Sequence, residues 1–239
     1  MPNKGGASMT YVMSDIHGEY DKYRKMLEKI DFCDEDTLYV LVDVVDRGVK
    51  PIQVLQDMMT RANVYPLMGN HDLVALSVLP KLNAELSKGS EAFSKELSEI
   101  IQVWYEDGGL STIAGFCDLD EDERADIIDY LGEFSLIEAV DIEDKAFVLV
   151  HSGLGNFRPD KKLKEYTEDE LLFDRPEPSM QYFDDESVYV VMGHTPTIFL
   201  NDKTEIYKNG RNIFIDCGAS APKGKLACLC LETFEEFYV

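Results

Sequence analysis

The sequence predicts an α/β fold, and three observations support this prediction. The first 70 residues alternate apolar runs of strand type with stretches of helix type. Four further β-rich runs lie in the last third of the chain. The composition, 45% hydrophobic and 29% charged over 239 residues, is that of a globular protein with a substantial core. Alternating strands and helices favour an α/β layout whose loops lie at one edge of the sheet.

The first five elements follow one another as strand, helix, strand, helix and strand. TYVMS and TLYVLVDVV are β-rich runs, an amphipathic stretch lies between them, and Pro51 suits the first turn of a second helix. The apolar segment before Gly69 predicts a buried strand that ends at a loop. We expect strands at 10–14, 37–45 and 64–68, and helices at about 19–30 and 51–60.

The middle of the chain, from about Leu73 to Leu131, has a helical pattern. Its acidic stretch DLDEDERADIIDY predicts a helix start with a solvated face, since it lacks the glycine and glutamate spacing of a calcium-binding loop. The runs AFVLVHSG, SVYVVMGHTP, RNIFIDCGA and KLACLCLE then predict four strands. We expect one domain over residues 9–239 with a helical insertion at about 73–131, after a flexible leader or cloning remnant at 1–8.

The charge of the chain restricts its partners. Forty-six acidic residues against 23 basic ones give a formal net charge of -23, which repels phosphate backbones and argues against nucleic acid. No apolar run has the length of a membrane span or of a signal peptide, so we expect a cytoplasmic protein without a membrane partner. The five cysteines lack zinc-type spacing, and Cys228 and Cys230 are expected to be buried, reduced thiols.

All four histidines occupy the same kind of position, because each follows an apolar strand-type run and lies next to or near a glycine. Core or surface histidines would be scattered over helices and loops, so this regularity predicts a shared site. Aspartates and an asparagine follow the same runs. The set is Asp15, His17, Asp43, Asp46, Asn70, His71, His151 and His194. Such oxygen and nitrogen ligands suit Mn²⁺, Fe or Zn²⁺. Their number is enough for two ions that share a carboxylate. Sites with two metal ions are suited to displacement reactions at phosphorus.

The motifs DIHG, DVVDRG, GNHD, VHSG and GHTP, in this order, resemble those of the phosphoprotein phosphatase branch of the calcineurin-like metallophosphoesterases. The resemblance covers Met13 to about Ala219 and implies a central β-sandwich flanked by helices. It also implies two divalent metal ions, with Mn²⁺ as the first candidate. By position, the implied ligands are Asp15 and His17 for the first ion, Asp43 as the bridge, and Asn70, His151 and His194 for the second.

The resemblance further implies how the residues act. His71 would be the general acid, oriented by Asp46, while Arg47 would hold a phosphoryl oxygen. Arg175 in LLFDR matches a second phosphate-binding arginine, and Asp216 in IDCGA matches a segment whose role is less sharply assigned. A water activated by the two metals would attack phosphorus directly. No covalent phosphoenzyme is then needed.

The chain departs from the family pattern at four positions. Ser14 and Val42 stand where glycines are usual, Asp72 replaces a glutamate of many relatives, and Ser152 replaces a glycine. None of these departures removes an implied metal ligand. Because no phosphoenzyme is needed, Ser152 and Cys217 are expected to be structural.

The substrate is a separate question with three possible answers. The first is phosphoserine or phosphothreonine in proteins, because VWYEDGGLSTI resembles the W-x-x-N-G-G-x-x-T-L stretch of bacterial-type protein phosphatases. The alternative is a dinucleoside polyphosphate such as diadenosine tetraphosphate, or another nucleotide, since the same core motifs serve such hydrolases. This polyanion fits the net charge less well. A non-catalytic metal-binding scaffold is the third, and the intact Arg47, His71 and Arg175 argue against it.

Overall fold

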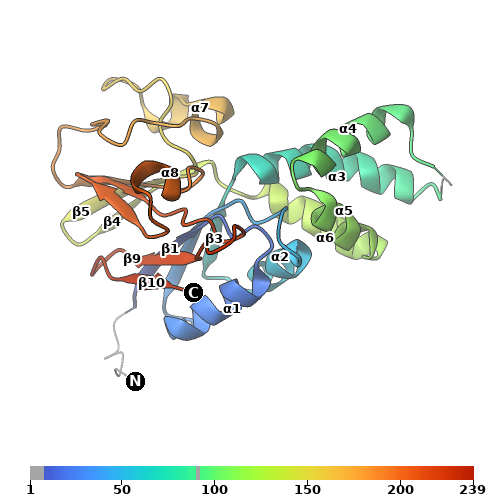
Figure 1. The fold of residues 1–239 in the computed structure, drawn as a ribbon, viewed down its shortest axis with the longest axis horizontal. Coiled ribbons are helices and arrows are strands. Elements are labelled where there is room, and N and C mark those ends of the chain that lie inside the picture. The colour runs from blue at the N-terminus through green and yellow to red at the C-terminus, as the bar shows by residue number, and fades with distance from the viewer. Residues whose placement is uncertain (1–7, 90–91) are drawn as a thin grey trace.

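Two five-stranded sheets form the centre of the computed structural model, which describes residues 8–89 and 92–239 (Figure 1). Their strand orders are β10-β9-β1-β2-β3 and β4-β5-β6-β8-β7. The strands are β1 (Thr10–Ser14), β2 (Thr37–Leu41), β3 (Val64–Leu67), β4 (Ile137–Ile142), β5 (Lys145–Val150), β6 (Val188–Met192), β7 (Tyr207–Asn209), β8 (Asn212–Phe214), β9 (Ala227–Cys230) and β10 (Glu236–Tyr238). The predicted α/β class with a two-sheet centre is confirmed, whereas residues 1–7 of the expected leader lie outside the described residues.

Helices cover the outer faces of the sheets and also form an arm (Figure 1). Helices α1 and α2 lie beside the first sheet, and α3 to α6 extend away from both sheets. The helices are α1 (Tyr20–Lys29), α2 (Pro51–Met59), α3 (Asn70–Leu86), α4 (Lys95–Glu106), α5 (Leu110–Cys117), α6 (Glu121–Gly132), the 3₁₀ helix η1 (Leu163–Glu165), α7 (Glu168–Leu172) and α8 (Ile198–Asn201). No helix among the described residues combines the length and the apolar composition that crossing a membrane requires.

An apolar core joins the two sheets and fixes their relative position. Val12, Leu41 and Leu67 project from the first sheet into this core. Leu149 and Val191 of the second sheet pack against them, and all five side chains are fully buried. Each fully buried Val or Leu side chain of this kind contributes about 1.5–3 kcal/mol to folding. The alternation of inward and outward side chains along each strand therefore builds the sandwich.

Parallel pairing brings the site-bearing loops to one edge of each sheet. β1 pairs with β2, and β2 with β3, all in parallel. In the second sheet β5 pairs with β6, and β6 with β8, again in parallel. The carboxyl ends of parallel strands meet at the same edge, so the polar segments that follow these strands converge.

Three boundaries differ from the sequence prediction. β2 ends at Leu41 and not at residue 45, because the backbone N–H groups of Val44 and Val45 donate to the Asp72 carboxylate instead of to a strand. Helix α3 begins at Asn70 and not at Leu73, so Asn70 lies in the first turn of a helix and not on an extended turn. The helical stretch is broken between α3 and α4.

Other local expectations are confirmed. Helix α6 starts after Asp120, whose carboxylate accepts from the Glu123 N–H, while the Glu123 side chain accepts from the Asp120 N–H. Cys228 and Cys230 are buried and free. The strands β4, β7 and β10 were not predicted, because their residues are partly buried or exposed and do not form a continuous apolar run.

Candidate metal centre and catalytic site

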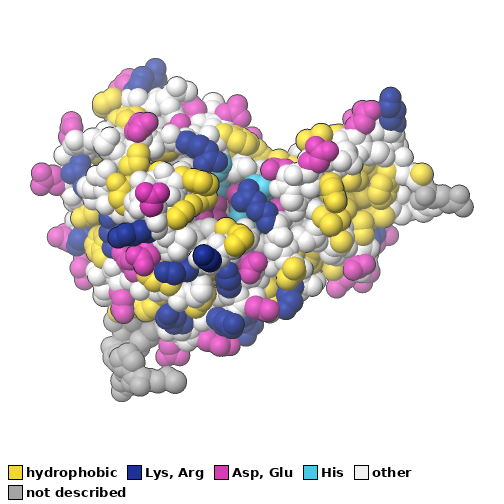
Figure 2. Space-filling model, in the orientation of Figure 1, with side chains coloured by type: hydrophobic (Ala, Val, Ile, Leu, Met, Phe, Trp, Pro, Cys, Tyr) yellow, Lys and Arg dark blue, Asp and Glu magenta, His cyan; other side chains and the backbone are white. Residues whose placement is uncertain are grey.

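The predicted site residues meet at a cavity of about 160 Å³, named here the site cavity. In Figure 2 histidine side chains lie at the bottom of a hollow near the middle of the face, with Lys and Arg side chains around it. The lining residues are Asp15, Asp43, Arg47, Asn70, His71, Asp107, Arg175 and His194. The remaining predicted residues, His17, Asp46 and His151, are buried and contact members of this lining. The structure therefore brings all the predicted site residues together.

Asp43 lies between two groups of potential metal ligands. One group is His17, Asp43 and His71, and the other is Asp43, His151 and His194. Within each group the ligand atoms lie within 4.8 Å of one another. The Asp43 Oδ2 atom is 3.6 Å from His17 Nε2 and 3.7 Å from His151 Nε2. This position suits the bridging carboxylate expected from the sequence, although the first group contains His71 where Asp15 was expected.

Asp15 is held on the other side of the cavity by the loop that carries His194. Its carboxylate oxygens accept from the His194 N–H at 3.1 and 3.3 Å, and the Ser14 hydroxyl donates to it. A side chain at Gly193 would overlap both Ser14 and Asp15. Ser14, at a position where glycine is usual, thus supplies a hydrogen bond to a candidate ligand.

The Nδ1 contacts of His17 and His151 direct their Nε2 atoms toward the Asp43 carboxylate. His17 Nδ1 lies 2.9 Å from the Val45 carbonyl and His151 Nδ1 lies 3.3 Å from the Leu41 carbonyl. A carbonyl only accepts, so each Nδ1 carries the proton and each Nε2 has a lone pair. His151 Nε2 faces Asn70 Oδ1 at 3.0 Å, so two acceptors point at one another. A cation bound by both atoms would resolve this unfavourable contact, so the donor set fits a metal ion.

The protonation states of the buried groups also fit a metal site. Burial lowers the pKa of His17 to about 4 and that of His194 to about 3, so both are neutral near pH 7. Neutral imidazole is the form that ligates metal. Burial opposes ionisation of Asp43, but the neighbouring His151, His17 and His71 lower its pKa to about 2. Burial and the nearby Asp43 raise the pKa of Asp15 to about 7.

His71 is oriented by a buried carboxylate. Its Nδ1 donates to Asp46 Oδ2 at 2.7 Å. Asp46 is itself fixed by the Trp104 indole N–H at 2.9 Å and by the Thr112 hydroxyl at 2.7 Å. Burial lowers the pKa of His71, but the hydrogen bond to Asp46 and the charge of Asp43 outweigh it and raise the pKa to about 9. This arrangement is that of a histidine poised to give up a proton.

Arg47 bridges two imidazoles. One terminal nitrogen lies 2.9 Å from His17 Nε2 and the other lies 2.9 Å from His71 Nε2. A guanidinium group only donates, so the arginine and a proton compete for the Nε2 atom of His71. The backbone holds Arg47 at a φ of 63°, and its N–H donates to the Gly108 carbonyl at 2.9 Å. Gly108 has a φ of 104°, a conformation that favours glycine.

Arg175 completes the cavity from the second sheet's side of the molecule. It follows helix α7 and directs one terminal nitrogen toward the His194 carbonyl at 3.4 Å and the Thr195 hydroxyl at 3.3 Å. Arg47 and Arg175 thus line the same cavity from elements far apart in the sequence. Two such planar donors suit the oxygens of a phosphoryl group.

Sequence analysis missed the roles of three residues in VWYEDGGLSTI. Trp104 and Thr112 hold Asp46, and Asp107 lies at the cavity with Oδ2 3.9 Å from His71 Nε2. The Trp and Thr positions of the W-x-x-N-G-G-x-x-T-L pattern were the available signal, but this stretch was used only to infer the substrate. Asp107 stands where that pattern has asparagine.

The two residues expected to be structural have structural contacts. The Ser152 hydroxyl donates to the Leu171 carbonyl at 2.8 Å and accepts from the Asp174 N–H at 3.1 Å. Burial raises the pKa of Cys217 to about 12, which keeps this thiol protonated. Asp216 is also buried and accepts from the Gly218 N–H at 2.8 Å, so it fixes a turn beside the site.

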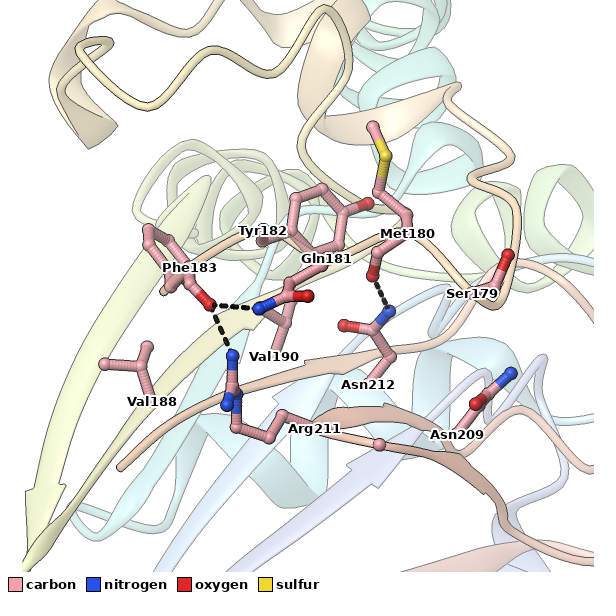
Figure 3. Close-up of a pocket in the computed structure, with 11 residues that line it drawn as sticks. Ser179, Met180, Gln181, Tyr182, Phe183, Val188, Val190, Asn209, Arg211 and Asn212 are labelled. Carbon is pink, nitrogen blue, oxygen red and sulfur yellow. Dashed lines mark hydrogen bonds between the residues drawn. The ribbon is translucent and has the colours of Figure 1, made fainter. Parts of the chain in front are cut away.

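A separate cavity of about 220 Å³ lies over β6 and β8 (Figure 3). Asn212 donates to the carbonyls of Pro178 and Met180 at 3.2 and 2.5 Å, and Arg211 and Gln181 both donate to the Phe183 carbonyl. These polar side chains are occupied in holding the loop that precedes β6. We therefore assign this cavity to support of the fold.

The sequence profile described as calcineurin-like phosphoesterase matches residues 9–219. The chain belongs to this family. The residues matched by the profile span every candidate ligand and both arginines of this metallophosphoesterase.

Several curated relatives of this metallophosphoesterase carry the same name. The symmetrical bis(5'-nucleosyl)-tetraphosphatase of Proteus mirabilis is 29% identical over 147 residues, which are 61% of this chain and 44% of the relative. The protein of the same name from Delftia acidovorans is 39% identical over 69 residues, which are 28% of this chain and 25% of the relative. The matched part thus spans less than half the length of these relatives.

Solved structures support the fold of the metallophosphoesterase. A candidate diadenosine tetraphosphatase superposes with a TM-score of 0.68 at 17% identity and covers 98% of this chain and 94% of its own. A protein serine/threonine phosphatase from Saccharomyces cerevisiae gives a TM-score of 0.60 at 14% identity, with 96% and 75% coverage. At these identities the likeness concerns the fold alone.

Proposed function

We propose that this metallophosphoesterase is a metal-dependent hydrolase of dinucleoside polyphosphates such as diadenosine tetraphosphate. The observation that carries the hydrolytic part is the position of Asp43 between two ligand groups, with Arg47 and Arg175 at the same cavity. The names of the curated relatives support the nucleotide substrate over the phosphoprotein expected first from the sequence. Because the matched part spans less than half of those relatives, the substrate is the part that most needs a test.

The stretch VWYEDGGLSTI no longer favours a protein substrate. Its Trp104 and Thr112 hold the Asp46 carboxylate, which positions His71. Positioning of His71 would serve proton transfer to either kind of leaving group. The stretch therefore supports catalysis without discriminating between a phosphoprotein and a nucleotide.

The residues that would hold the metal ions offer oxygen and imidazole nitrogen atoms and no thiolate. This donor set favours Mn²⁺, with Fe or Zn²⁺ as alternatives. When bound, two divalent ions would neutralise phosphoryl charge and acidify the attacking water. The proposed ligands are Asp15, His17, Asp43, Asn70, His151 and His194.

Arg47 connects substrate binding to proton transfer. Without substrate its guanidinium donates to the Nε2 atoms of His17 and His71. A phosphoryl oxygen in the site cavity would draw these donors away, because a charged acceptor binds them more strongly than a neutral imidazole. The Nε2 atom of His71 would then be free to carry a proton. Arg175 would bind a second phosphoryl oxygen from the opposite side.

His71 would protonate the leaving group. Water adds to phosphorus, the bond from phosphorus to the bridging oxygen breaks, and the departing nucleotide takes the proton from Nε2. Asp46, at 2.7 Å from Nδ1, stabilises the charged imidazole before transfer and keeps the ring oriented. General acid catalysis of this kind typically supplies about 10²–10⁴-fold in rate.

The proposal is tested with protein reconstituted with Mn²⁺, Fe²⁺ or Zn²⁺ and three substrates. These are diadenosine tetraphosphate, a phosphoserine peptide and 4-nitrophenyl phosphate, with products separated by chromatography. We expect the dinucleotide to have the highest kcat/KM and symmetrical cleavage to give two molecules of ADP. His151→Asn serves as the control that loses metal and activity together.

The alternatives have distinct outcomes. A higher kcat/KM for the phosphopeptide would assign the protein to the serine/threonine phosphatases. Failure of the metal-loaded protein on all three substrates would support the non-catalytic scaffold.

A further inference from the structure

A second cavity adjoins the site and has no role in the mechanism above. It has a volume of about 530 Å³ and is named here the outer cavity. His17 and Arg47 line it, and Arg47 also lines the site cavity, so the two spaces meet at this arginine. Its other walls are the segments 196–205 and 216–224. Neither segment contributes an implied metal ligand.

The volumes of the two cavities suggest what each can hold. Small-molecule sites typically occupy about 300–1,000 Å³. The site cavity, about 160 Å³, is sized for a phosphoryl group and the atoms bound to it. The outer cavity, about 530 Å³, has room for a nucleoside. A substrate that fills both must therefore join a phosphoryl group to a larger group beyond Arg47.

Hydrogen bonds fix the two walls of the outer cavity. The Thr197 N–H donates to the Asp216 carbonyl at 2.8 Å, which ties the walls together. Lys22 donates to the carbonyls of Ala219 and Gly224 and so closes the 216–224 loop. A side chain at Gly224 would overlap the Gly218 carbonyl, so the ends of the loop touch. A wall that is already ordered costs little entropy when it binds a ligand.

The side chains of the outer cavity offer an aromatic surface and charges of both signs, since Asp202, Glu205 and Asp216 line it together with the cations. Phe199 is 79% exposed and Ile198 is 40% exposed, although both are large apolar residues. Lys203 and Lys223 also line the cavity, and neither ammonium group has an ion-pair partner within residues 8–89 and 92–239. Glu205 is paired with Lys225 at 3.5 Å, and Asp216 is buried. Arg47, Lys203 and Lys223 therefore outnumber the remaining carboxylate, Asp202. An exposed aromatic ring beside this positive charge suits a ligand with a flat ring and negative charge.

We propose that the outer cavity binds one of the two nucleoside diphosphate halves of the substrate, with its base against Phe199 and its phosphates directed toward Arg47. This inference rests on the proposed function, since it places one half of the dinucleotide substrate. Lys203 and Lys223 supply positive charge near the phosphates. The base stacks on the ring of Phe199, and Ile198 packs beside it.

The test compares Phe199→Ala with Phe199→Tyr. Two quantities are measured: KM for diadenosine tetraphosphate, and Ki for ADP as a competitive inhibitor of 4-nitrophenyl phosphate hydrolysis. Loss of stacking on one base is expected to raise both quantities roughly 5- to 20-fold in Phe199→Ala. Phe199→Tyr keeps a ring and should stay close to the unmodified protein. Because Phe199 is 79% exposed, its truncation should not unfold the chain.

A matched control and a charge variant sharpen the comparison. Tyr65→Ala removes another half-exposed aromatic ring, at 48% exposure, which lines a different cavity. We expect its KM and Ki values to be unchanged. Lys223→Gln should weaken inhibition by ADP more than inhibition by adenosine, because only ADP carries phosphates.

The outcomes separate the two proposals. Hydrolysis of the dinucleotide with unchanged KM and Ki in Phe199→Ala would overturn the outer-cavity assignment and leave the proposed function intact. Absence of dinucleotide hydrolysis, together with ADP inhibition that depends on Phe199, would reject the proposed function and keep the nucleotide site. Absence of both would reject both.

Discussion

The Oδ2 atom of Asp46 lies 2.7 Å from Nδ1 of His71 and also accepts the indole N–H of Trp104 at 2.9 Å. The fully buried Asp46 carboxylate thus orients His71. The family resemblance assigns His71 the role of general acid and not that of a metal ligand. This relationship separates His71 from the other three histidines, whose Nε2 atoms or backbone N–H contact Asp43, Asn70 or Asp15.

His71→Asn tests the proton donor. A poor leaving group needs a proton more than a good one, so we expect a loss of about 10²–10⁴-fold on phenyl phosphate and a clearly smaller loss on 4-nitrophenyl phosphate. The metal content should remain that of the unmodified protein, which elemental analysis measures. Loss of one metal ion would instead place His71 in the ligand group that it forms with His17 and Asp43.

Asp43→Asn and Arg175→Ala should fail for different reasons. Asp43 belongs to both ligand groups, so Asp43→Asn should lower the metal stoichiometry and abolish hydrolysis. Arg175 contacts no candidate ligand side chain among the described residues, so Arg175→Ala should keep its metals and mainly raise KM. Metal analysis beside steady-state kinetics distinguishes the two. Equal metal content and equal loss of activity would contradict both roles.

Trp104→Phe should affect stability and rate together. It removes one of the hydrogen bonds to the buried Asp46 carboxylate, and such bonds to charged groups contribute about 1.5–3 kcal/mol. We expect a lower free energy of unfolding in urea and a kcat that falls less than in His71→Asn. Thr112→Val should behave similarly and Thr112→Ser should not, because serine keeps the hydroxyl. Unchanged kcat in both Trp104→Phe and Thr112→Val would mean that the support of Asp46 is not needed for catalysis.

Metal affinity should depend on pH through Asp15. Its pKa in the metal-free protein is raised to about 7 by burial and by Asp43, so below that pH a proton must leave before metal binds. The apparent Kd should rise as pH falls below about 7, by up to about tenfold per pH unit for one linked proton.

The raised pKa of Asp15 also means that this carboxyl favours folding of the metal-free protein at pH below about 4. That contribution is lost as pH rises toward about 7.

The matching control is Asp15→Asn. Calorimetric titration between pH 5 and 8 should give a flatter dependence of Kd on pH for this variant. An unchanged slope would assign the linked proton to another group.

Asp107→Asn tests the charge at the mouth of the site cavity. The Asp107 side chain is 64% exposed and lines the cavity, where its negative charge repels a polyanionic substrate. Removing the charge should lower KM for diadenosine tetraphosphate about two- to fivefold at low salt, and the difference should shrink as salt screens it. An increase in KM would show that the carboxylate contributes a favourable contact.

The sequence was sufficient to predict which polar residues gather at one edge of the sheets, whereas their roles as metal ligands stay a prediction. Every candidate ligand follows a strand-type run, and parallel strands place such positions together. The start of α3 was not predictable from periodicity, because it depends on Asp72, whose buried carboxylate accepts backbone N–H groups of Val44, Val45 and Gly69. That cap exists only once two distant segments have met.

Sequence periodicity also could not predict which residues hold Asp46 and thereby position His71. Trp104 and Thr112 lie in a helical region whose apolar pattern says which face is buried but not which buried group it contacts. The outer cavity also arises from tertiary packing. Its walls are two loops joined by the hydrogen bond from the Thr197 N–H to the Asp216 carbonyl. Local patterns do not encode the approach of such loops.

Trp104 is the single tryptophan of the chain. Its indole N–H is bonded to the same Asp46 oxygen that accepts from His71, so the fluorophore is coupled to the charge of that pair. Emission of the unlabelled protein, excited at wavelengths that tyrosine does not absorb, therefore reports on one place only. Rapid mixing with substrate or metal would record rearrangement at the acid as a change in emission, without any label and without waiting for product.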